Sequence, residues 1–209
     1  MKRLVFLFVL LAAQSAIAQE SKEPKVYVFG QVGSASIDFD KGPNDAVLRS
    51  AGATGLNSTV NDTATAAIIG LGYKFVPQAS VEVAYMHVSD YTYKAAFVQG
   101  TASDVFSASG IGLNLVGYLP VGEKVNVYGK LGMWSFDVDE TATVSAAGFG
   151  QAKASSSNTT PMIGVGVEFK LTPQFAIRAE YDHFNKIGDD STIGSSKLDY
   201  LSAGIAVSF

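Results

Sequence analysis

The sequence lacks several features that would place it in common protein classes. None of its 209 residues is a cysteine, so neither a disulfide framework nor thiolate chemistry is available to it. Charged residues make up only 16% of the chain, and acidic residues outnumber basic ones by 19 to 15. This balance argues against nucleic acid as a partner. Beyond the first 18 residues, no stretch approaches the roughly 18 consecutive apolar residues of a membrane-spanning helix.

Residues 1–18 have the pattern of a secretory signal peptide. Lys2 and Arg3 supply its positive start, and the ten residues from Leu4 to Ala13 are largely apolar. This run is too short for a membrane-spanning helix. The sequence Ala16-Ile17-Ala18 has the small-residue pattern of a cleavage site. We therefore predict a single mature domain over residues 19–209, with 13 basic residues against 19 acidic ones and a net charge of −6.

The last nine residues, 201–209, alternate between apolar and small or polar side chains. One face carries Leu201, Ala203, Ile205, Val207 and Phe209, and the other carries Ser202, Gly204, Ala206 and Ser208. A period of two is that of a β-strand. A closed barrel in a membrane can end on such a strand, because the last strand pairs with the first and leaves no open edge. Together with the export signal, this pattern predicts a barrel in the outer membrane of a Gram-negative bacterium.

Eight alternating segments follow one another along the mature chain. They are 26–38, 64–76, 79–91, 105–118, 124–138, 161–171, 173–186 and 198–209. Each reaches the roughly 9–11 residues that a tilted transmembrane strand needs. Short links alternate with long polar ones, which cover 39–63, 92–104, 139–160 and 187–197. We therefore predict an all-β, eight-stranded antiparallel transmembrane β-barrel with short periplasmic turns and long extracellular loops.

The two faces of these segments predict what lies inside the barrel. Apolar side chains such as Val165 and Ile177 alternate with charged ones, and we assign the apolar set to the lipid and the charged set to the interior. The predicted interior ion-pair network consists of Glu82, Lys130, Glu168, Arg178 and Glu180. An unpaired buried ion costs several kcal/mol, so a structural role is favoured. A gate, in which the pairs exchange to pass ions or water, is the alternative.

Aromatic residues gather near the ends of the segments. Those beside the short turns are Tyr73, Phe75, Phe169, Phe175 and Phe209, and those toward the long loops are Tyr85, Trp134, Phe136, Tyr181 and Phe184. Amphipathic rings favour the headgroup level of a bilayer, so we predict two aromatic girdles. The core of a soluble β-sandwich is the alternative for these aromatic residues.

The last third of the chain resembles a known family. The stretches Val167 to Pro173, Ala176 to Tyr181 and Asn185 to Asp189 are similar to the last hairpin of the outer membrane protein A family, in its transmembrane domain. The strand Val81 to Tyr85 and the run Val127 to Gly132 are similar to it as well. The resemblance implies an outer-membrane barrel whose assembly machinery reads a terminal aromatic residue, here Phe209.

Two departures from that family limit what the resemblance implies. Its larger members add a periplasmic peptidoglycan-binding domain, whereas this sequence ends with the predicted barrel. The family carries an interior lysine on its fourth strand, where this chain reads Gly112 to Gly117 without a positive charge. A stand-alone barrel also resembles the outer membrane protein X branch, whose members are associated with adhesion and serum resistance.

One short motif raises the possibility of catalysis. His87-Val88-Ser89-Asp90 places an imidazole and a hydroxyl on one face, similar to the His-x-Ser pair of lipid A 3-O-deacylases. A serine nucleophile needs a base and an orienting acid, but strand alternation predicts Asp90 on the opposite face. His183 has no serine beside it. We therefore predict no catalytic residues, and the loops show no spacing typical of a metal or cofactor site.

These observations predict an integral outer-membrane protein with a structural or surface-interactive role, in envelope integrity or in adhesion through the long loops. An eight-stranded barrel is just wide enough for side chains to fill, so we expect no open pore. The expected partners are outer-membrane lipid and lipopolysaccharide, the barrel assembly machinery, and a host or cell-surface ligand bound through the loops, with the barrel itself a monomer. A lipid A hydrolase and a small gated ion channel are the alternatives.

Overall fold

The computed structural model describes residues 26–38, 40–146, 150–189 and 194–209. The strands are β1 (Val26–Ile37), β2 (Asn57–Asn61), β3 (Thr63–Val76), β4 (Ala79–Phe97), β5 (Gly100–Pro120), β6 (Val125–Ser145), β7 (Gln151–Lys170), β8 (Phe175–Asp189) and β9 (Gly194–Ser208). One helix, α2 (Gly42–Ser50), lies between β1 and β2. The predicted signal peptide at residues 1–18 lies outside the described residues and stays a prediction.

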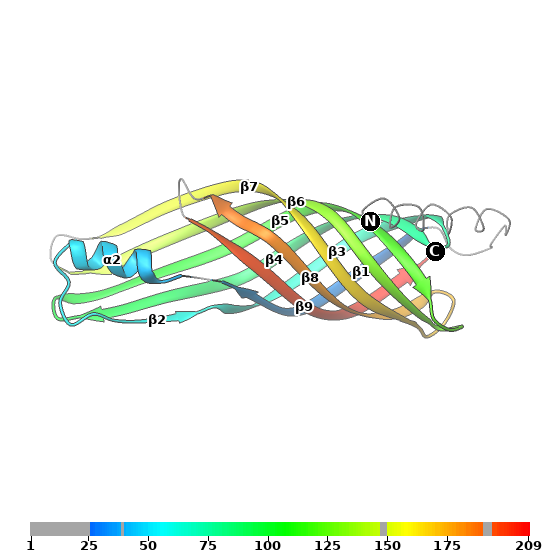
Figure 1. The fold of residues 1–209 in the computed structure, drawn as a ribbon, viewed down its shortest axis with the longest axis horizontal. Helices are drawn as coiled ribbons and strands as arrows, with labels where there is room; N and C mark the ends of the chain where they lie inside the picture. The colour runs from blue at the N-terminus through cyan, green and yellow to red at the C-terminus, as the bar shows by residue number, and fades with distance from the viewer. Residues whose placement is uncertain (1–25, 39, 147–149, 190–193) are drawn as a thin grey trace, which may run out of the picture.

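Eight of the strands in the described residues close into an antiparallel barrel (Figure 1). Every neighbouring pair is antiparallel, and β1 closes the ring by pairing with both β3 and β9. The closing register sets Tyr27 opposite Ser208 and Ile37 opposite Leu198. Closure leaves the transmembrane strands without a free edge, as a bilayer requires. The predicted fold is confirmed, and β2 is an extra strand that pairs with β4.

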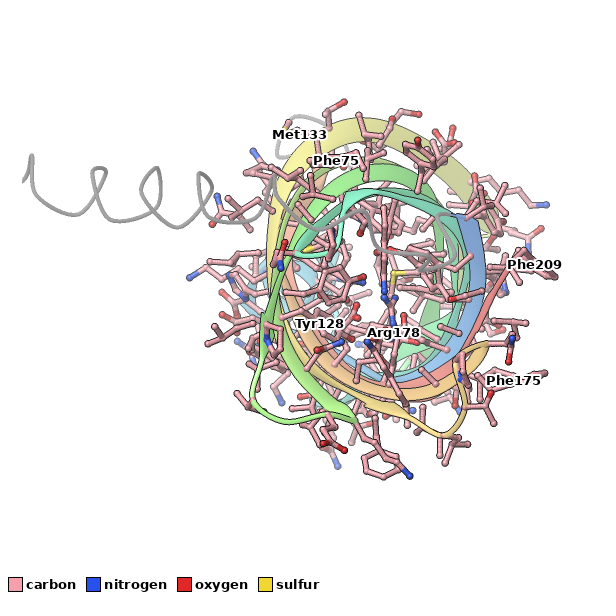
Figure 2. The ribbon with its side chains drawn as sticks, turned by 90° about the vertical axis from the view of Figure 1, so that its right-hand side faces the viewer. Phe75, Tyr128, Met133, Phe175, Arg178 and Phe209 are labelled. Carbon is pink, nitrogen blue, oxygen red and sulfur yellow. The ribbon has the colours of Figure 1, made fainter. Side chains whose placement is uncertain are left out.

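The outer wall of the barrel is apolar over the middle of every strand. Exposed side chains on this wall include Ile69, Leu71, Leu113, Leu131, Val165 and Ile205, each more than half exposed. All five aromatic residues predicted beside the short turns also point outward, and Figure 2 shows Phe75, Phe175 and Phe209 on the outside of the ring. Such a band, exposed on one face and alternating with buried residues, is the lipid-facing surface of a transmembrane barrel.

The prediction of a second girdle toward the long loops is wrong for three of its five residues. Tyr85 and Tyr181 are exposed on the outer wall, but Trp134, Phe136 and Phe184 are at most 1% exposed and lie inside. Their positions follow the period of two, since Trp134 and Phe136 share the inward face of β6 with Lys130. Nearness to the end of a segment therefore predicts the direction of an aromatic side chain less well than alternation does.

Large aromatic rings fill the narrow lumen, and each lies directly over a glycine of a neighbouring strand. Tyr27 pairs with Gly72, and a Cβ added at Gly72 would lie 2.0 Å from Tyr27 Cζ. Trp134 pairs with Gly112, where an added Cβ would lie 2.2 Å from Trp134 Cδ2. Only glycine leaves room for these rings, so the interior is filled by side chains.

Three of the four predicted long loops are largely strand. β4 continues to Phe97 and β5 begins at Gly100, so the predicted loop 92–104 is a tight hairpin, and β6, β7, β8 and β9 extend similarly into the predicted loops 139–160 and 187–197. Beyond the lipid both faces of a strand meet water, so the apolar alternation that marks a strand is lost. The backbone ladder nevertheless continues, with Glu140 paired to both Phe106 and Ala154.

The remaining predicted loop, 39–63, contains α2 and β2. The helix has Pro43 in its first turn, where a missing N–H costs no hydrogen bond, and it ends near Gly52, whose φ is +96°. Figure 1 shows α2 against the extended strands, at the end far from the C-terminus. No helix in the described ranges is long and apolar enough to cross a membrane.

Candidate functional site

Two regions concentrate polar chemistry: an ion-pair network inside the barrel and a platform at the extracellular end. The five residues predicted for the interior come from β4, β6, β7 and β8. Their exposed fractions are 0% for Glu82, 3% for Lys130, 3% for Glu168, 0% for Arg178 and 2% for Glu180. Figure 2 shows Arg178 and Tyr128 pointing into the ring. The structure therefore brings all five together in the lumen.

Each of the two cations in this network joins two carboxylates. Lys130 Nζ lies 2.6 Å from Glu180 Oε1 and 3.0 Å from Glu82 Oε2. Arg178 donates from Nη1 to Glu82 Oε1 at 2.8 Å and from Nε to Glu168 Oε2 at 3.1 Å. Glu82 is thus shared by both cations. Because every member has a partner of opposite charge, the desolvation cost of burying these ions is offset in part by attraction at close range.

Neutral donors complete the coordination of the carboxylates. The hydroxyl of Tyr27 donates to Glu82 at 2.7 Å, the hydroxyl of Tyr128 donates to Glu180 at 2.7 Å, and the amide of Asn126 donates to Glu168 at 3.0 Å. The Arg178 guanidinium lies 5.1 to 5.3 Å from the centres of three aromatic rings, those of Tyr27, Phe29 and Tyr128. Such cation–π contacts are favourable when desolvated. The network and its rings fill one layer of the lumen.

A second layer, toward the extracellular end, is aromatic. Phe184 meets Trp134 edge to face at 5.5 Å between ring centres and meets Phe136 in the same way at 5.3 Å. The indole N–H of Trp134 donates to Asn114 Oδ1 at 2.8 Å. Sequence reasoning missed this layer. Lys130 and Trp134 are an even number of residues apart and so share one face of β6, which would have indicated it.

His87 and His183 lie on the outer wall, near the extracellular edge of the apolar band. Ser89 Oγ donates to the backbone carbonyl of Thr65 at 2.8 Å and accepts from its N–H at 3.1 Å. A β-bulge between Val88 and Tyr91 leaves Ser89 and Asp90 both exposed, so the prediction that they lie on opposite faces is wrong. The hydroxyl of Ser89 is thus bound to backbone and, among the described residues, makes no hydrogen bond with His87.

His183 has a partner that sequence reasoning missed. Its Nδ1 lies 2.6 Å from Asp199 Oδ1, and the Tyr181 hydroxyl donates to the same oxygen at 2.7 Å. Asp199 stands opposite His183 on β9, so the pairing register would have indicated the contact. A histidine held by a carboxylate can act as a base, but a serine nucleophile must also lie within its reach. In the described part of the chain, no group of three or more His, Asp or Glu side chains is placed to hold a metal ion.

The extracellular platform consists of α2, β2 and the ends of β4, β5 and β6 that lie beyond the apolar band, away from the short turns. It has its own hydrophobic cluster, apart from that of the lumen. The cluster comprises Leu48, Leu56, Val60, Tyr93, Ala95, Phe97, Ala102 and Val144. Leu48 comes from α2, Val60 from β2 and Tyr93 from β4. A packed cluster above the membrane makes this end of the protein an ordered surface.

Buried polar contacts hold α2 onto the strands. Asp45 accepts from the Tyr93 hydroxyl at 2.6 Å and from the Ser58 hydroxyl at 3.0 Å. The Tyr93 hydrogen bond holds the pKa of the Asp45 carboxyl below its usual range, while burial raises the pKa of Tyr93. Asn44 donates to Asp104 at 2.9 Å, and burial raises the pKa of Asp104. Sequence reasoning found neither the helix nor these contacts.

Comparison with known proteins shows the family to which this barrel belongs. The family model of the OmpA-like transmembrane domain matches residues 21–209. The chain belongs to the OmpA-like transmembrane domain family. It is 31% identical to outer membrane protein A of Shigella flexneri over 140 residues, which are 66% of this chain and 38% of that protein. It is 29% identical to outer membrane protein A of Klebsiella pneumoniae over 153 residues, 72% of this chain and 42% of that protein. The match thus spans about two fifths of the length of these relatives.

Solved structures share the fold of this OmpA-like barrel. Neisserial surface protein A has a TM-score of 0.54 at 18% identity, with 88% of this chain and 97% of that chain covered. Ail, the attachment invasion locus protein of Yersinia pestis, has a TM-score of 0.54 at 17% identity, with 90% and 99% covered. The family and the fold place this protein in the outer membrane.

The interior lysine of this OmpA-like barrel is the predicted Lys130, on β6 and not on the fourth strand. The resemblance implied a lysine on the fourth barrel strand, which is β5, but β5 presents Asn114 to the lumen and Asn114 accepts from Trp134. The buried lysine is Lys130 on β6, the next strand. It reaches Glu82 and Glu180 from there, so the network keeps a lysine although the fourth strand supplies none.

Proposed function

We propose that this OmpA-like barrel is a closed, non-enzymatic outer-membrane protein that binds a host or cell-surface ligand through its extracellular platform. The observation that carries this proposal is that the part beyond the lipid has a hydrophobic cluster and buried hydrogen bonds of its own. Loops that only connect strands need no such packing. Ordered surfaces bind at a lower entropic cost than flexible loops, so this construction favours recognition.

The edge of β7 supports strand addition as the mode of binding. β7 begins at Gln151, but its described pairing with β8 covers only Met162 to Lys170. The backbone of residues 151–157 is therefore paired on the β6 side alone within the described ranges. An exposed sheet edge can accept an extended peptide through main-chain hydrogen bonds. Adhesion also agrees with the name of the structural relative from Yersinia pestis, an attachment invasion locus protein.

The absence of an open pore and of catalysis belongs to the same proposal. The ion-pair layer and the aromatic layer fill the lumen between the two ends, which supports a closed barrel. The engagement of Ser89 with the backbone of Thr65 weighs against a hydrolase of the lipid A deacylase type. Unchanged lipid A mass spectra in cells with and without the protein would agree with this assignment.

The remaining partners are also proposals. Outer-membrane lipid and lipopolysaccharide surround the apolar wall, and the barrel functions as a monomer. Phe209 serves as the signal for the assembly machinery. Its side chain is 72% exposed and its N–H donates to the carbonyl of Val26 at 2.8 Å, so its ring is accessible at the rim.

A trimmed variant tests the platform. Asp139 stands opposite Ser155, so residues 140–154 can be replaced by a two-residue Asn-Gly turn without shifting the register below. We expect the barrel to keep its heat-modifiable electrophoretic shift, because exposed loop length costs little closure entropy. Binding to cultured cells and to extracellular-matrix proteins should fall. If wild type binds neither, or the folded trimmed variant binds equally well, the proposal is wrong.

A further inference from the structure

One buried carboxyl group of the lumen, that of Asp182, lies outside the ion-pair network. It is on the inward face of β8, two residues after Glu180 and two residues before Phe184. Asp182 therefore lies between the ion-pair layer and the aromatic layer, and its exposed fraction is 1%. A carboxyl group in such a place must either meet positive charge and hydrogen-bond donors or lose its own charge.

Asp182 has little around it to stabilise a negative charge. In the described part of the chain, no hydrogen-bond partner reaches its Oδ1 atom. The charge of Lys130 acts on it, but the ammonium group of Lys130 forms its ion pairs with Glu180 at 2.6 Å and with Glu82 at 3.0 Å. The charges of these two glutamates would repel a further carboxylate at this position.

The residues opposite Asp182 on the two neighbouring strands are uncharged. On β9 the opposite residue is Tyr200, whose hydroxyl donates to the backbone carbonyl of Ala66 at 3.2 Å. On β7 the opposite residue is Gly164, and a Cβ added there would clash with Asp182 Oδ1. The carboxyl group thus lies directly over Gly164, where only glycine leaves room for it.

The nearest polar group to Asp182 on its own strand is a carboxylate that already has several donors. Glu180 accepts from Lys130 at 2.6 Å, from the Tyr128 hydroxyl at 2.7 Å and from the Gln31 amide at 3.1 Å. An ionised carboxylate has about four acceptor positions, so one remains. The carboxyl group of Asp182 is within hydrogen-bonding reach of Glu180. Two carboxyl groups can share a hydrogen bond only if one of them carries a proton, and the donors around Glu180 favour its ionised form.

The balance of charge in the lumen gives the same assignment. The ion-pair network has three carboxylates and two cations, and the charge of Lys74 also acts on Glu168. These charges balance without Asp182. An ionised Asp182 would add a buried negative charge with no cation of its own, and a buried carboxyl group in that position becomes neutral instead.

We propose that the folded barrel binds one proton in its lumen, on the carboxyl group of Asp182, and that this O–H donates to Glu180. The proton comes from solvent and forms an O–H bond with the carboxylate as the barrel folds, and no other bond changes. The acid then fills the space between the two layers without adding charge, so no counter-ion has to enter the lumen. The proposal rests on the lumen alone and is independent of the ligand proposed for the platform.

Infrared spectroscopy of the folded barrel at pH 7 tests this protonation. The carbonyl stretch of a protonated carboxyl group is separate from the amide and carboxylate bands, and alkyl-maltoside micelles add no ester carbonyl to that region. We expect wild type to show this band. It should shift when the protein is made with aspartate that carries ¹³C in its side-chain carboxyl group, and it should stay in place with glutamate labelled in the same way.

Two variants assign the band to a residue. Asp182→Asn should remove it and should leave the urea midpoint of the barrel close to that of wild type, because the amide is also neutral and can also donate to Glu180. Asp104→Asn is the matched control, since Asp104 is a buried aspartate of the platform that accepts from Asn44, and this variant should keep the band.

Three results would overturn the proposal: no band in wild type, a band that shifts with labelled glutamate instead of labelled aspartate, or a band that persists in folded Asp182→Asn. Loss of the band in Asp104→Asn would place the proton in the platform and overturn it as well. If Asp182→Asn does not fold, the isotope shifts of wild type and the spectrum of Asp104→Asn still decide the question.

Discussion

Lys130 and Glu82 form an ion pair of 3.0 Å across the lumen, although β5 separates the strands that carry them. The pair joins residues 48 positions apart in the chain. Arg178 reaches the same glutamate from β8 at 2.8 Å. Glu82 therefore holds two cations from different sides of the barrel. This shared carboxylate links the walls of the lumen, and it makes the network sensitive to the loss of any one member.

Replacing Arg178 by Ala should destabilise the barrel by about 3–5 kcal/mol, because it leaves buried carboxylates without their cation. Glu168 loses the cation that is hydrogen-bonded to it, whereas Glu82 keeps its ion pair with Lys130. Adding Glu168→Gln to Arg178→Ala should therefore recover part of the loss. Urea unfolding of the barrel in phospholipid vesicles measures both changes, with Glu168→Gln alone as the control. A double variant no more stable than Arg178→Ala would contradict this account.

Conductance distinguishes a plug from a gate. With both the ion-pair layer and the aromatic layer in place, we expect wild type to show no discrete conductance in planar bilayers. Arg178→Ala should produce at most a small leak, because Trp134, Phe136 and Phe184 still fill the layer above. Regular switching between open and closed levels in wild type, altered by either Arg178→Ala or Glu168→Gln, would instead make this protein a small gated channel.

Arginine on the lipid-facing wall should be costly, and by an amount that depends on depth. Val165 and Ile205 are 54% and 57% exposed in the middle of the apolar band. Replacing either by Arg should cost about 2–4 kcal/mol of folding free energy in a bilayer. Thr159 lies on the same face of β7, beyond that band, and is the matched control. Equal losses at Val165 and Thr159, measured by folding in vesicles, would refute the position assigned to the band.

A glycine beneath a ring should tolerate no side chain. A Cβ at Gly72 would lie 2.0 Å from Tyr27 Cζ, so Gly72→Ala should cost about 1–3 kcal/mol through overpacking. Gly129 is also a strand glycine, but there the nearest atom to an added Cβ is 3.8 Å away. Gly129→Ala should change the unfolding free energy little. Equal stability of the two variants in urea titration would show that the lumen can expand around Tyr27.

Much of the fold follows from the period of two, and its failures have physical causes. Alternation placed Glu168 and Arg178 on inward faces, and adjacent strands then set them opposite each other. It failed above the membrane, where both faces of β6 and β7 are solvated and no apolar side marks the strand. The contact between Lys130 and Glu82 depends on how the closed barrel brings non-neighbouring strands together, which no local pattern contains. Helix α2 is short and depends on tertiary contacts such as Asp45 with Tyr93.

The hydrogen bonds at Asp45 make the attachment of α2 dependent on pH. Because the folded pKa of this carboxyl lies below its unfolded value, its contribution to stability is present above the unfolded pKa, near 4, and is lost as pH falls through the folded value. We therefore expect α2 to stay attached at pH 5–7 and to loosen only in stronger acid. Amide hydrogen exchange of residues 42–50, followed from pH 6 to pH 3, measures this.

Substitutions at the same contact test its cause at neutral pH. Tyr93→Phe removes the donor that lies 2.6 Å from Asp45, and a hydrogen bond to a charged group contributes about 1.5–3 kcal/mol. Cleavage by trypsin after the exposed Arg49 should accelerate in Tyr93→Phe and in Asp45→Asn, because both free the helix more often. Asp139→Asn, on the exposed face of β6, controls for the loss of one charge. If Arg49 is cut at the wild-type rate in Asp45→Asn, the helix is held by its apolar contacts through Leu48 rather than by this carboxylate.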